Sequence, residues 1–162
     1  YRSTGISDQF TFEDLQFDLK YIPPDLMTLQ ESGMQVSKED FSQIKENYLG
    51  LEYYVFRIEA PENVLNYQLQ ANETPQERLN YYAFQMQKDL QLIVGMDTLQ
   101  CQLFHLEQNS GIAPYLTFSL GFETPKTQTD RKFYYTDPIF RTEQIELTIK
   151  QSAIDAAPSL AL

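Results

Sequence analysis

Apolar and polar positions alternate along much of the chain, which predicts a protein built mainly of β-strands. The stretch "LQFDLKYIPP", residues 15–24, places apolar side chains at every second position, the period of a strand with one buried face. Two prolines close the stretch, and neither can donate a backbone hydrogen bond to a neighbouring strand. We therefore expect a strand that ends at the prolines and faces the core with Leu15, Phe17, Leu19 and Tyr21.

Further strands are predicted later in the chain, because β-branched and aromatic residues are frequent there. The stretches are "LEYYVFRIEA" (51–60), "TLQCQLFHLE" (98–107), "YLTFSLGF" (115–122), "RKFYY" (131–135) and "EQIELTIK" (143–150). The turn residues Asn109-Ser110-Gly111 predict a hairpin between the second and third of these stretches. We expect residues 1–9 to be a flexible lead-in.

Two segments predict helices. "SKEDFSQIKENY" (37–48) begins with Ser37, a favourable N-cap residue. "TPQERLNYYAFQMQKD" (74–89) has Thr74 as a cap, Pro75 in the first helical position and Glu77 placed to reach back. The following "LQLIV" either continues that helix or forms a buried strand. We prefer a helix that ends at about residue 88, followed by a strand.

The order of elements is strand, helix, strand, helix and then several strands joined by short turns. Short turns cannot connect neighbouring parallel strands. We therefore predict an α+β fold with a mostly antiparallel β-sheet, either a curved sheet or a sandwich, and about two helices that cover one face. Residues 1–150 are expected to form a single domain and residues 151–162 a C-terminal tail.

The only cysteine and the only histidine, Cys101 and His105, lie four positions apart. A cysteine nucleophile needs its histidine within hydrogen-bond reach, about 3 Å. On a strand, four residues span roughly 13 Å, so the two side chains should share a face without forming a catalytic dyad. We interpret Cys101 as a core residue. Glu107 lies two positions beyond the histidine and is close enough to pair with it.

The apolar side of the predicted strand 98–107 changes along its length. Leu99, Cys101 and Leu103 fall on one side, whereas Phe104 and Leu106 fall on the other. A bulge near Leu103-Phe104 would reconcile the two halves by adding one residue to the strand. Alternatively, both faces of the strand are covered there. Either interpretation predicts a central strand.

Adjacent tyrosines occur at 53–54, 81–82 and 134–135. Neighbouring residues of a strand point to opposite faces, so each strand pair is expected to place one tyrosine outward. We take Tyr53, Tyr81 and Tyr134, together with His105 and Glu107, as candidates for a functional surface that binds a protein or a carbohydrate. Packing between strands is the competing interpretation.

Composition limits the classes of partner. The net charge is −11 and the 12 Lys and Arg residues form no basic cluster, so nucleic-acid binding is disfavoured. A single cysteine excludes an intrachain disulfide and a cysteine-based zinc site, and the acidic residues lack a calcium-loop spacing. We predict no catalytic residues, no metal and no cofactor. No apolar run approaches the ~20 residues that cross a bilayer, so no transmembrane segment is expected.

The segments "FDLKYIPPDLM" and "HLEQNSGIAPYLTFSLGF", in a chain rich in Gln and Tyr, resemble uncharacterised exported proteins and lipoproteins of Bacteroidetes. The resemblance implies an envelope protein and supplies no functional residues. The chain starts with Tyr rather than Met, so we expect it to begin within a longer precursor. The expected location is therefore extracytoplasmic, in the periplasm or at the cell surface.

These observations favour a non-enzymatic extracytoplasmic domain with a structural or protein-interaction role in a cell-envelope assembly. Its partner would be another protein or a second copy of the chain. The alternative is a module that binds a small ligand or carbohydrate through its tyrosines. A third hypothesis is a hydrolase that uses acidic residues or Cys101.

Overall fold

The computed structural model describes residues 6–23, 50–107, 114–142 and 144–156. Eight strands form one antiparallel sheet in the order β1-β2-β3-β6-β5-β4-β7-β8. Their bounds are Ser7–Phe12 (β1), Leu15–Ile22 (β2), Leu51–Glu59 (β3), Leu90–Val94 (β4), Asp97–Leu106 (β5), Tyr115–Glu123 (β6), Arg131–Tyr135 (β7) and Ile145–Ile149 (β8). The prediction of a mostly antiparallel sheet is confirmed.

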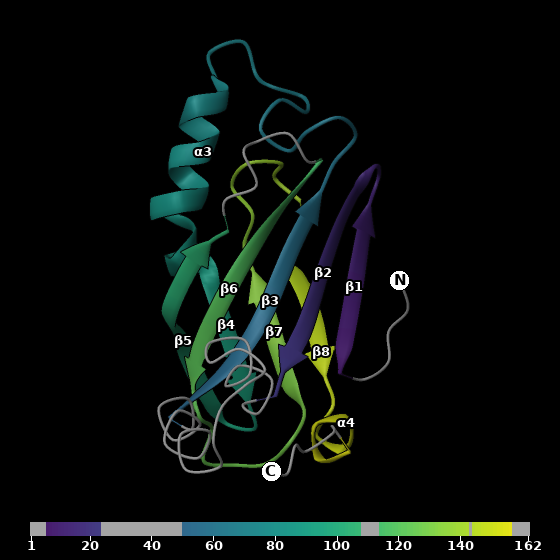
Figure 1. Ribbon diagram of the computed structural model, residues 1–162, viewed down its shortest axis with the longest axis vertical. Helices are drawn as coiled ribbons and strands as arrows, with labels where there is room; N and C mark the ends of the chain where they lie inside the picture. The colour runs from purple at the N-terminus through teal and green to yellow at the C-terminus, as the bar shows by residue number, and fades with distance from the viewer. Residues whose placement is uncertain (1–5, 24–49, 108–113, 143, 157–162) are drawn as a thin grey trace, which may run out of the picture.

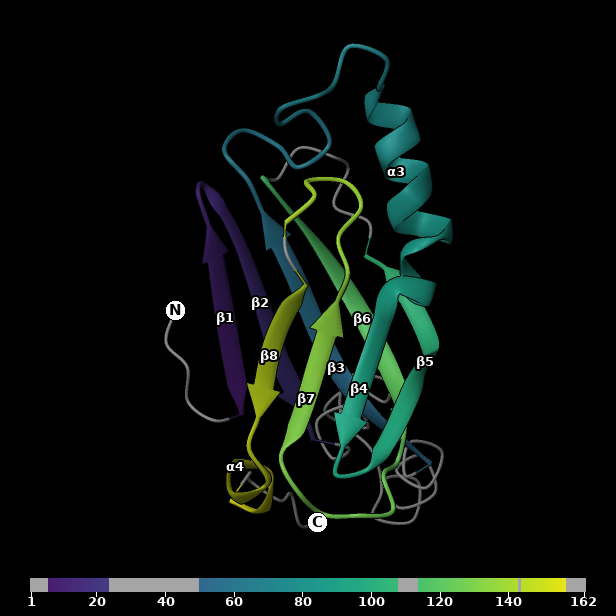
Figure 2. The ribbon, with the colours of Figure 1, turned by 180° about the vertical axis from the view of Figure 1, so that it is seen from behind.

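The sheet curves until it is nearly closed. Strands β1, β2, β3 and β6 form one layer, and β4, β7 and β8 form the layer behind it (Figures 1 and 2). Strand β5 lies at the side where the sheet folds over. Its first half, Asp97–Gln100, pairs with β4, and its second half, Cys101–Leu106, pairs with β6. One strand therefore belongs to both layers.

A β-bulge marks the point where β5 changes layer. The register with β6 shifts between Cys101 and Leu103, so Cys101 is buried whereas Gln102 and Leu103 are both exposed. After the bulge, Phe104 and Leu106 face the core in the opposite phase. Strands that turn the corner between two layers commonly do so at a bulge or bend. Of the two interpretations of the phase change, the structure shows the bulge, and the predicted central position of this strand is confirmed.

Aromatic side chains fill the space between the two layers. Phe56 of β3 packs against two rings of β7 in the opposite layer, with centroid distances of 5.1 Å to Phe133 and 5.8 Å to Tyr135. The rings of Phe17 in β2 and Phe118 in β6 each lie 6.3 Å, centroid to centroid, from the ring of Phe56. All five side chains have no exposed surface. The interior is thus a packed core, as in other small closed sheets.

Strands β1 and β8 stand at the two ends of the strand order and lie side by side. Each pairs with only one neighbouring strand. Asp8 of β1 bridges the seam, because its Oδ2 accepts a hydrogen bond of 2.9 Å from the backbone N–H of Thr148 in β8. A side chain therefore occupies the position that a ladder bond would take in a fully closed barrel.

The helix predicted after Thr74 is present as α3, Pro75–Phe84. The Thr74 hydroxyl accepts a hydrogen bond of 3.2 Å from the backbone N–H of Glu77, as the capping pattern predicted. A 3₁₀ turn, η1 (Met86–Asp89), follows and leads directly into β4, so the preference for a strand at "LQLIV" is confirmed. Tyr82 of α3 is fully buried and its ring lies 5.9 Å from Phe118.

Two elements differ from the sequence-based expectation. The prediction of a flexible lead-in is wrong for residues 7–9, which begin β1, because six consecutive residues pair with β2 in register. The short helix α4, Gln151–Asp155, forms at the start of the segment expected to be a tail. The predicted helix over 37–48 and the predicted turn at 109–111 lie outside the described residues.

Candidate functional site

Cys101 is a core residue in the structure. It is 7% exposed, and its Sγ donates a hydrogen bond of 3.1 Å to the backbone carbonyl of Leu103. Burial raises the pKa of the Cys101 thiol to about 11, so the thiolate needed for nucleophilic attack is scarce at neutral pH. The bulge also places Cys101 inward and His105 outward, which corrects the expectation that they share a face. This geometry disfavours a Cys/His dyad.

His105 and Glu107 do come together on the outer surface. His105 Nε2 lies 4.0 Å from Glu107 Oε2, and the two side chains are 63% and 47% exposed. Ser119 of β6 stands opposite His105 and donates a hydrogen bond of 2.6 Å to Glu107 Oε1. The serine therefore binds the carboxylate directly, whereas a catalytic triad requires a histidine to accept the proton of the hydroxyl. The arrangement suits a solvated polar surface better than acyl transfer.

The three candidate tyrosines occupy different environments. Tyr53 points outward from β3, as strand alternation predicted, yet it is only 6% exposed, so its ring is not accessible to a partner. Tyr81 of α3 is also buried, and its hydroxyl donates a hydrogen bond of 2.7 Å to Asp89 Oδ2. Only Tyr134 is partly exposed, on the outer face of β7. Its ring is the accessible one of the three.

Tyr134 lines a groove on the outer face of β4 and β7. The volume of the groove is about 710 Å³, within the usual range for small-molecule sites. Its floor comes from the sheet, and its wall comes from the loop before β7 and from the first residue of α4. The lining residues are Ile93, Gly95, Gln128, Thr129, Asp130, Lys132, Tyr134 and Gln151.

A buried arginine organises the wall of this groove. Arg131 has no exposed surface and forms a two-pronged ion pair with Glu52 of β3, at 2.6 Å for Nη2–Oε2 and 3.2 Å for Nε–Oε1. The same guanidinium donates to Thr129 O at 2.7 Å, to Gln128 Oε1 at 3.3 Å and to the Gln151 side-chain oxygen. The ion pair thus links opposite layers of the core and holds three residues of the groove.

Besides burial, Glu52 also contributes to the raised pKa of two neighbouring tyrosines, Tyr54 and Tyr21. Tyr54 donates a hydrogen bond of 2.8 Å to Glu52 Oε1. Burial, reinforced by the negative charge of Glu52, raises the pKa of Tyr54 well above its ordinary value and that of Tyr21 to about 12. Both hydroxyls therefore stay protonated at physiological pH, and Tyr54 serves as a donor to the carboxylate.

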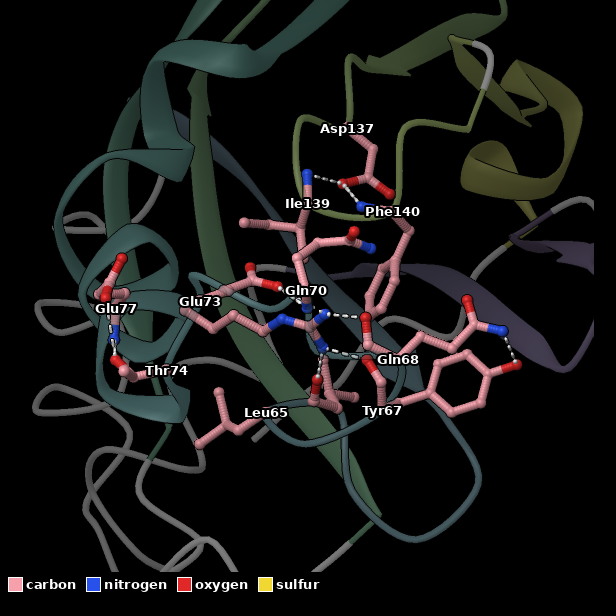
Figure 3. Close-up of polar contacts among 12 residues, drawn as sticks. Leu65, Tyr67, Gln68, Gln70, Glu73, Thr74, Glu77, Asp137, Ile139 and Phe140 are labelled. Carbon is pink, nitrogen blue, oxygen red and sulfur yellow. Dashed lines mark hydrogen bonds and ion pairs between the residues drawn. The ribbon is translucent and has the colours of Figure 1, made fainter.

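A second buried arginine holds the long connection between β3 and α3. Arg78 of α3 donates to the backbone carbonyls of Val64 (2.8 Å), Gln68 (3.0 Å) and Tyr67, and forms an ion pair of 3.0 Å with Glu73. Figure 3 shows Tyr67, Gln68 and Glu73 gathered around this guanidinium. Three of the acceptors are backbone carbonyls of the loop, so the guanidinium shapes the loop, and the ion pair with Glu73 balances its charge.

Asp137 lies near this loop and is 4% exposed. Its Oδ1 accepts hydrogen bonds from the backbone N–H groups of Ile139 (2.8 Å) and Phe140 (3.2 Å), contacts that are visible in Figure 3. Burial raises the pKa of Asp137 above the usual range for a carboxyl, although both N–H bonds oppose that shift. Among the described residues, three buried side-chain atoms have no hydrogen-bond partner: Asp137 Oδ2, the hydroxyl of Tyr82 and Arg78 Nε.

The described residues contain no group of three or more His, Cys, Asp or Glu side chains arranged to hold a metal ion. Within the same ranges, no helix combines the length and apolar character required to cross a membrane.

The structure defines a class of protein: a nearly closed antiparallel sheet with a filled core and a polar groove on its outer face. Comparisons with protein-family models, with curated proteins and with solved structures found no match for this chain.

Proposed function

We propose that this chain is a non-enzymatic, extracytoplasmic protein-interaction domain that works in a cell-envelope assembly. The proposal is carried by two exposed apolar side chains, one on each of two elements that contact each other, α3 and β5. Phe84 at the end of α3 is 82% exposed, and Leu103 at the bulge of β5 is 46% exposed. Aromatic residues are enriched at protein–protein interfaces, and both side chains project from regular elements.

The chemistry of the candidate residues supports binding over catalysis. Cys101 is buried with a raised pKa, and Glu107 accepts its hydrogen bond directly from Ser119. The Cys101 thiol donates to a backbone carbonyl and not to a base, and Ser119 donates to a carboxylate rather than to the histidine that a triad requires. The extracytoplasmic part of the proposal draws on the sequence resemblance to exported proteins, and fractionation of the producing cells tests it separately.

Self-association is the first measurement, because a second copy of the chain is the simplest partner. We expect concentration-dependent dimers in sedimentation velocity, weakened by Phe84→Ser and by Leu103→Ser. Met96→Ser is the matched control, since Met96 is 100% exposed but lies in the turn between β4 and β5, away from the bulge.

If the chain stays monomeric, the partner is a different protein. A photo-crosslinking residue at position 84 should then give one defined product in the producing cells, and the same residue at position 96 should not. A monomer at all concentrations, together with equal or absent crosslinking at both positions, would contradict the proposal.

A second candidate function is the binding of a small ligand or carbohydrate. The groove beside Tyr134 favours it, because a partly exposed aromatic ring and several polar side chains converge on one concave surface.

A further inference from the structure

We propose that the groove on the outer face of β4 and β7 binds a neutral oligosaccharide, with the ring of Tyr134 as the platform on which a sugar stacks. The inference rests on the second candidate function and is independent of any protein contact at Phe84. It assigns the ligand class and the residues that would make the contacts.

The polar groups of the groove follow one line along β7. Lys132 and Tyr134 alternate with the buried Arg131, Phe133 and Tyr135, so they share the outer face of the strand. Asp130 directly precedes the strand and also lines the groove. At about 3.3 Å per residue, these three lining positions span roughly 13 Å. An elongated surface of this kind fits a short chain of sugar rings better than a single compact metabolite.

The contact groups are held in place before any ligand arrives. Tyr134 donates a hydrogen bond of 2.6 Å to Glu146 of β8, which orients the ring on the sheet. Asp130 Oδ1 accepts a hydrogen bond of 2.9 Å from the backbone N–H of Gln151. The buried guanidinium of Arg131 fixes the wall through Gln128, Thr129 and Gln151. Such preorganisation reduces the entropy that binding would otherwise cost.

Free polar groups also remain for a ligand. Within the described residues, the second carboxylate oxygen of Asp130, the ammonium group of Lys132 and the amide N–H₂ of Gln128 have no hydrogen-bond or ion-pair partner. Together they present an acceptor and several donors, the combination that hydroxyl groups require because each hydroxyl both donates and accepts. The aromatic ring supplies the apolar contact for the C–H face of a sugar.

Charge argues for a neutral ligand. The charged groups that line the groove are one carboxylate and one ammonium, Asp130 and Lys132, which cancel. The whole chain carries a net charge of −11, so it repels anionic ligands at long range. Phosphorylated or uronic-acid ligands are therefore disfavoured, whereas an uncharged oligosaccharide meets no such barrier.

The test is an NMR titration of the ¹⁵N-labelled protein with cellobiose, maltose, mannobiose and N,N′-diacetylchitobiose, each up to about 10 mM, which detects millimolar affinities. At least one of these sugars should shift the backbone amides of Lys132 and Tyr134. Digalacturonate is the charged comparison and should cause no shifts there.

Variants of Tyr134 distinguish the contribution of its aromatic ring to binding from a general effect on the fold. Tyr134→Ala should weaken binding at least about tenfold, whereas Tyr134→Phe keeps the ring and should retain most of the affinity. Tyr115→Ala is the matched control, because Tyr115 lies on β6, under Arg57 and outside the groove. The proposal is overturned if no neutral disaccharide shifts the groove amides, or if Tyr134→Ala binds as tightly as the wild type. Either result leaves the dimerisation and crosslinking experiments at Phe84 unaffected.

Discussion

A buried ion pair lies in the core of this protein, and its effect on stability depends on whether both charged residues are present. Arg131 and Glu52 make their ion pair inside the nearly closed sheet, with Tyr54 as a third member. A buried pair of this kind has a small net effect on stability, because desolvation offsets much of the attraction. Loss of one partner is different, since it leaves the other charge buried and unpaired.

The first prediction concerns that pair. Glu52→Gln should lower the free energy of unfolding by about 3–5 kcal/mol, because the guanidinium of Arg131 loses its counter-charge. The double variant Glu52→Leu/Arg131→Met should recover a large part of the loss, since no charge then remains buried. Urea denaturation of the wild type, Glu52→Leu, Arg131→Met and the double variant measures the coupling. Additive effects of the two single changes would contradict this account.

Asp137 gives a prediction about pH. The pKa of Asp137 is raised in the folded protein. At a pH between the ordinary carboxyl pKa and this raised pKa, the folded state therefore holds a proton that the unfolded state has released. Stability therefore falls as the pH rises from the ordinary carboxyl pKa through the raised one, and the penalty persists above it. Asp137→Asn keeps the Oδ1 acceptor for Ile139 and Phe140 but removes the charge.

We expect Asp137→Asn to match or exceed the wild type in melting temperature at pH 7. The advantage should shrink as the pH falls through the raised pKa of Asp137, because the wild-type carboxyl then takes up a proton. Melting curves measured between about pH 4 and pH 8 test this linkage. Glu123→Gln on the exposed end of β6 is the control, and a difference that does not vary with pH would exclude the titration of Asp137 as its cause.

At the scale of elements, β5 decides the shape of the molecule. The inward side chains of this strand change phase between Cys101 and Phe104, a feature visible in the sequence as two apolar sets that do not align. The phase change indicated either a bulge or a strand covered on both faces, and the structure has the bulge. The sequence did not show that the strand changes partners there, from β4 to β6, because pairing depends on residues far apart in the chain.

Gly121 of β6 permits this corner. A Cβ atom added at Gly121 would lie 3.0 Å from Leu103 Cβ and 3.3 Å from Leu51 Cδ1. Gly121→Ala should therefore destabilise the protein by about 1–3 kcal/mol through overpacking against the bulge. Ser119→Ala, one outward position earlier on the same strand, should stay within ~0.5 kcal/mol. Chemical denaturation of both variants measures the change in the free energy of unfolding. Equal changes in Gly121→Ala and Ser119→Ala would rule out a special role for Gly121.

At the scale of the whole molecule, closure of the sheet depends on the seam between β1 and β8. Asp8→Ala removes the acceptor for the Thr148 N–H and should cost about 1 kcal/mol. We also expect faster hydrogen exchange at the Thr148 amide, whereas the ladder amides of β3 should be unaffected. Asp8→Asn keeps an acceptor and should preserve the protection. If Thr148 exchanges at the wild-type rate in Asp8→Ala, the side-chain bridge does not hold the seam.

The sequence alone was a partial guide to the candidate site. It singled out Tyr134 as an outward tyrosine and brought His105 together with Glu107, because strand alternation places those side chains. Glu52 and Arg131 were missed as partners, although each stands in the inward phase of its strand. A charged residue at a core position signals a buried partner, but the partner lies 79 positions away and only the fold identifies it.

The residue pattern by itself determined the local structure: most of the strands, the capped start of α3, the change of apolar phase in β5 and the burial of Cys101. These features follow from contacts between residues close in sequence or from the side-chain period of a strand. The tertiary structure alone decided the strand order, the near closure of the sheet, the arginine–glutamate pair across the core and the groove beside Tyr134. All four depend on which distant strands become neighbours, and many pairings of the same strands would satisfy the local pattern equally well.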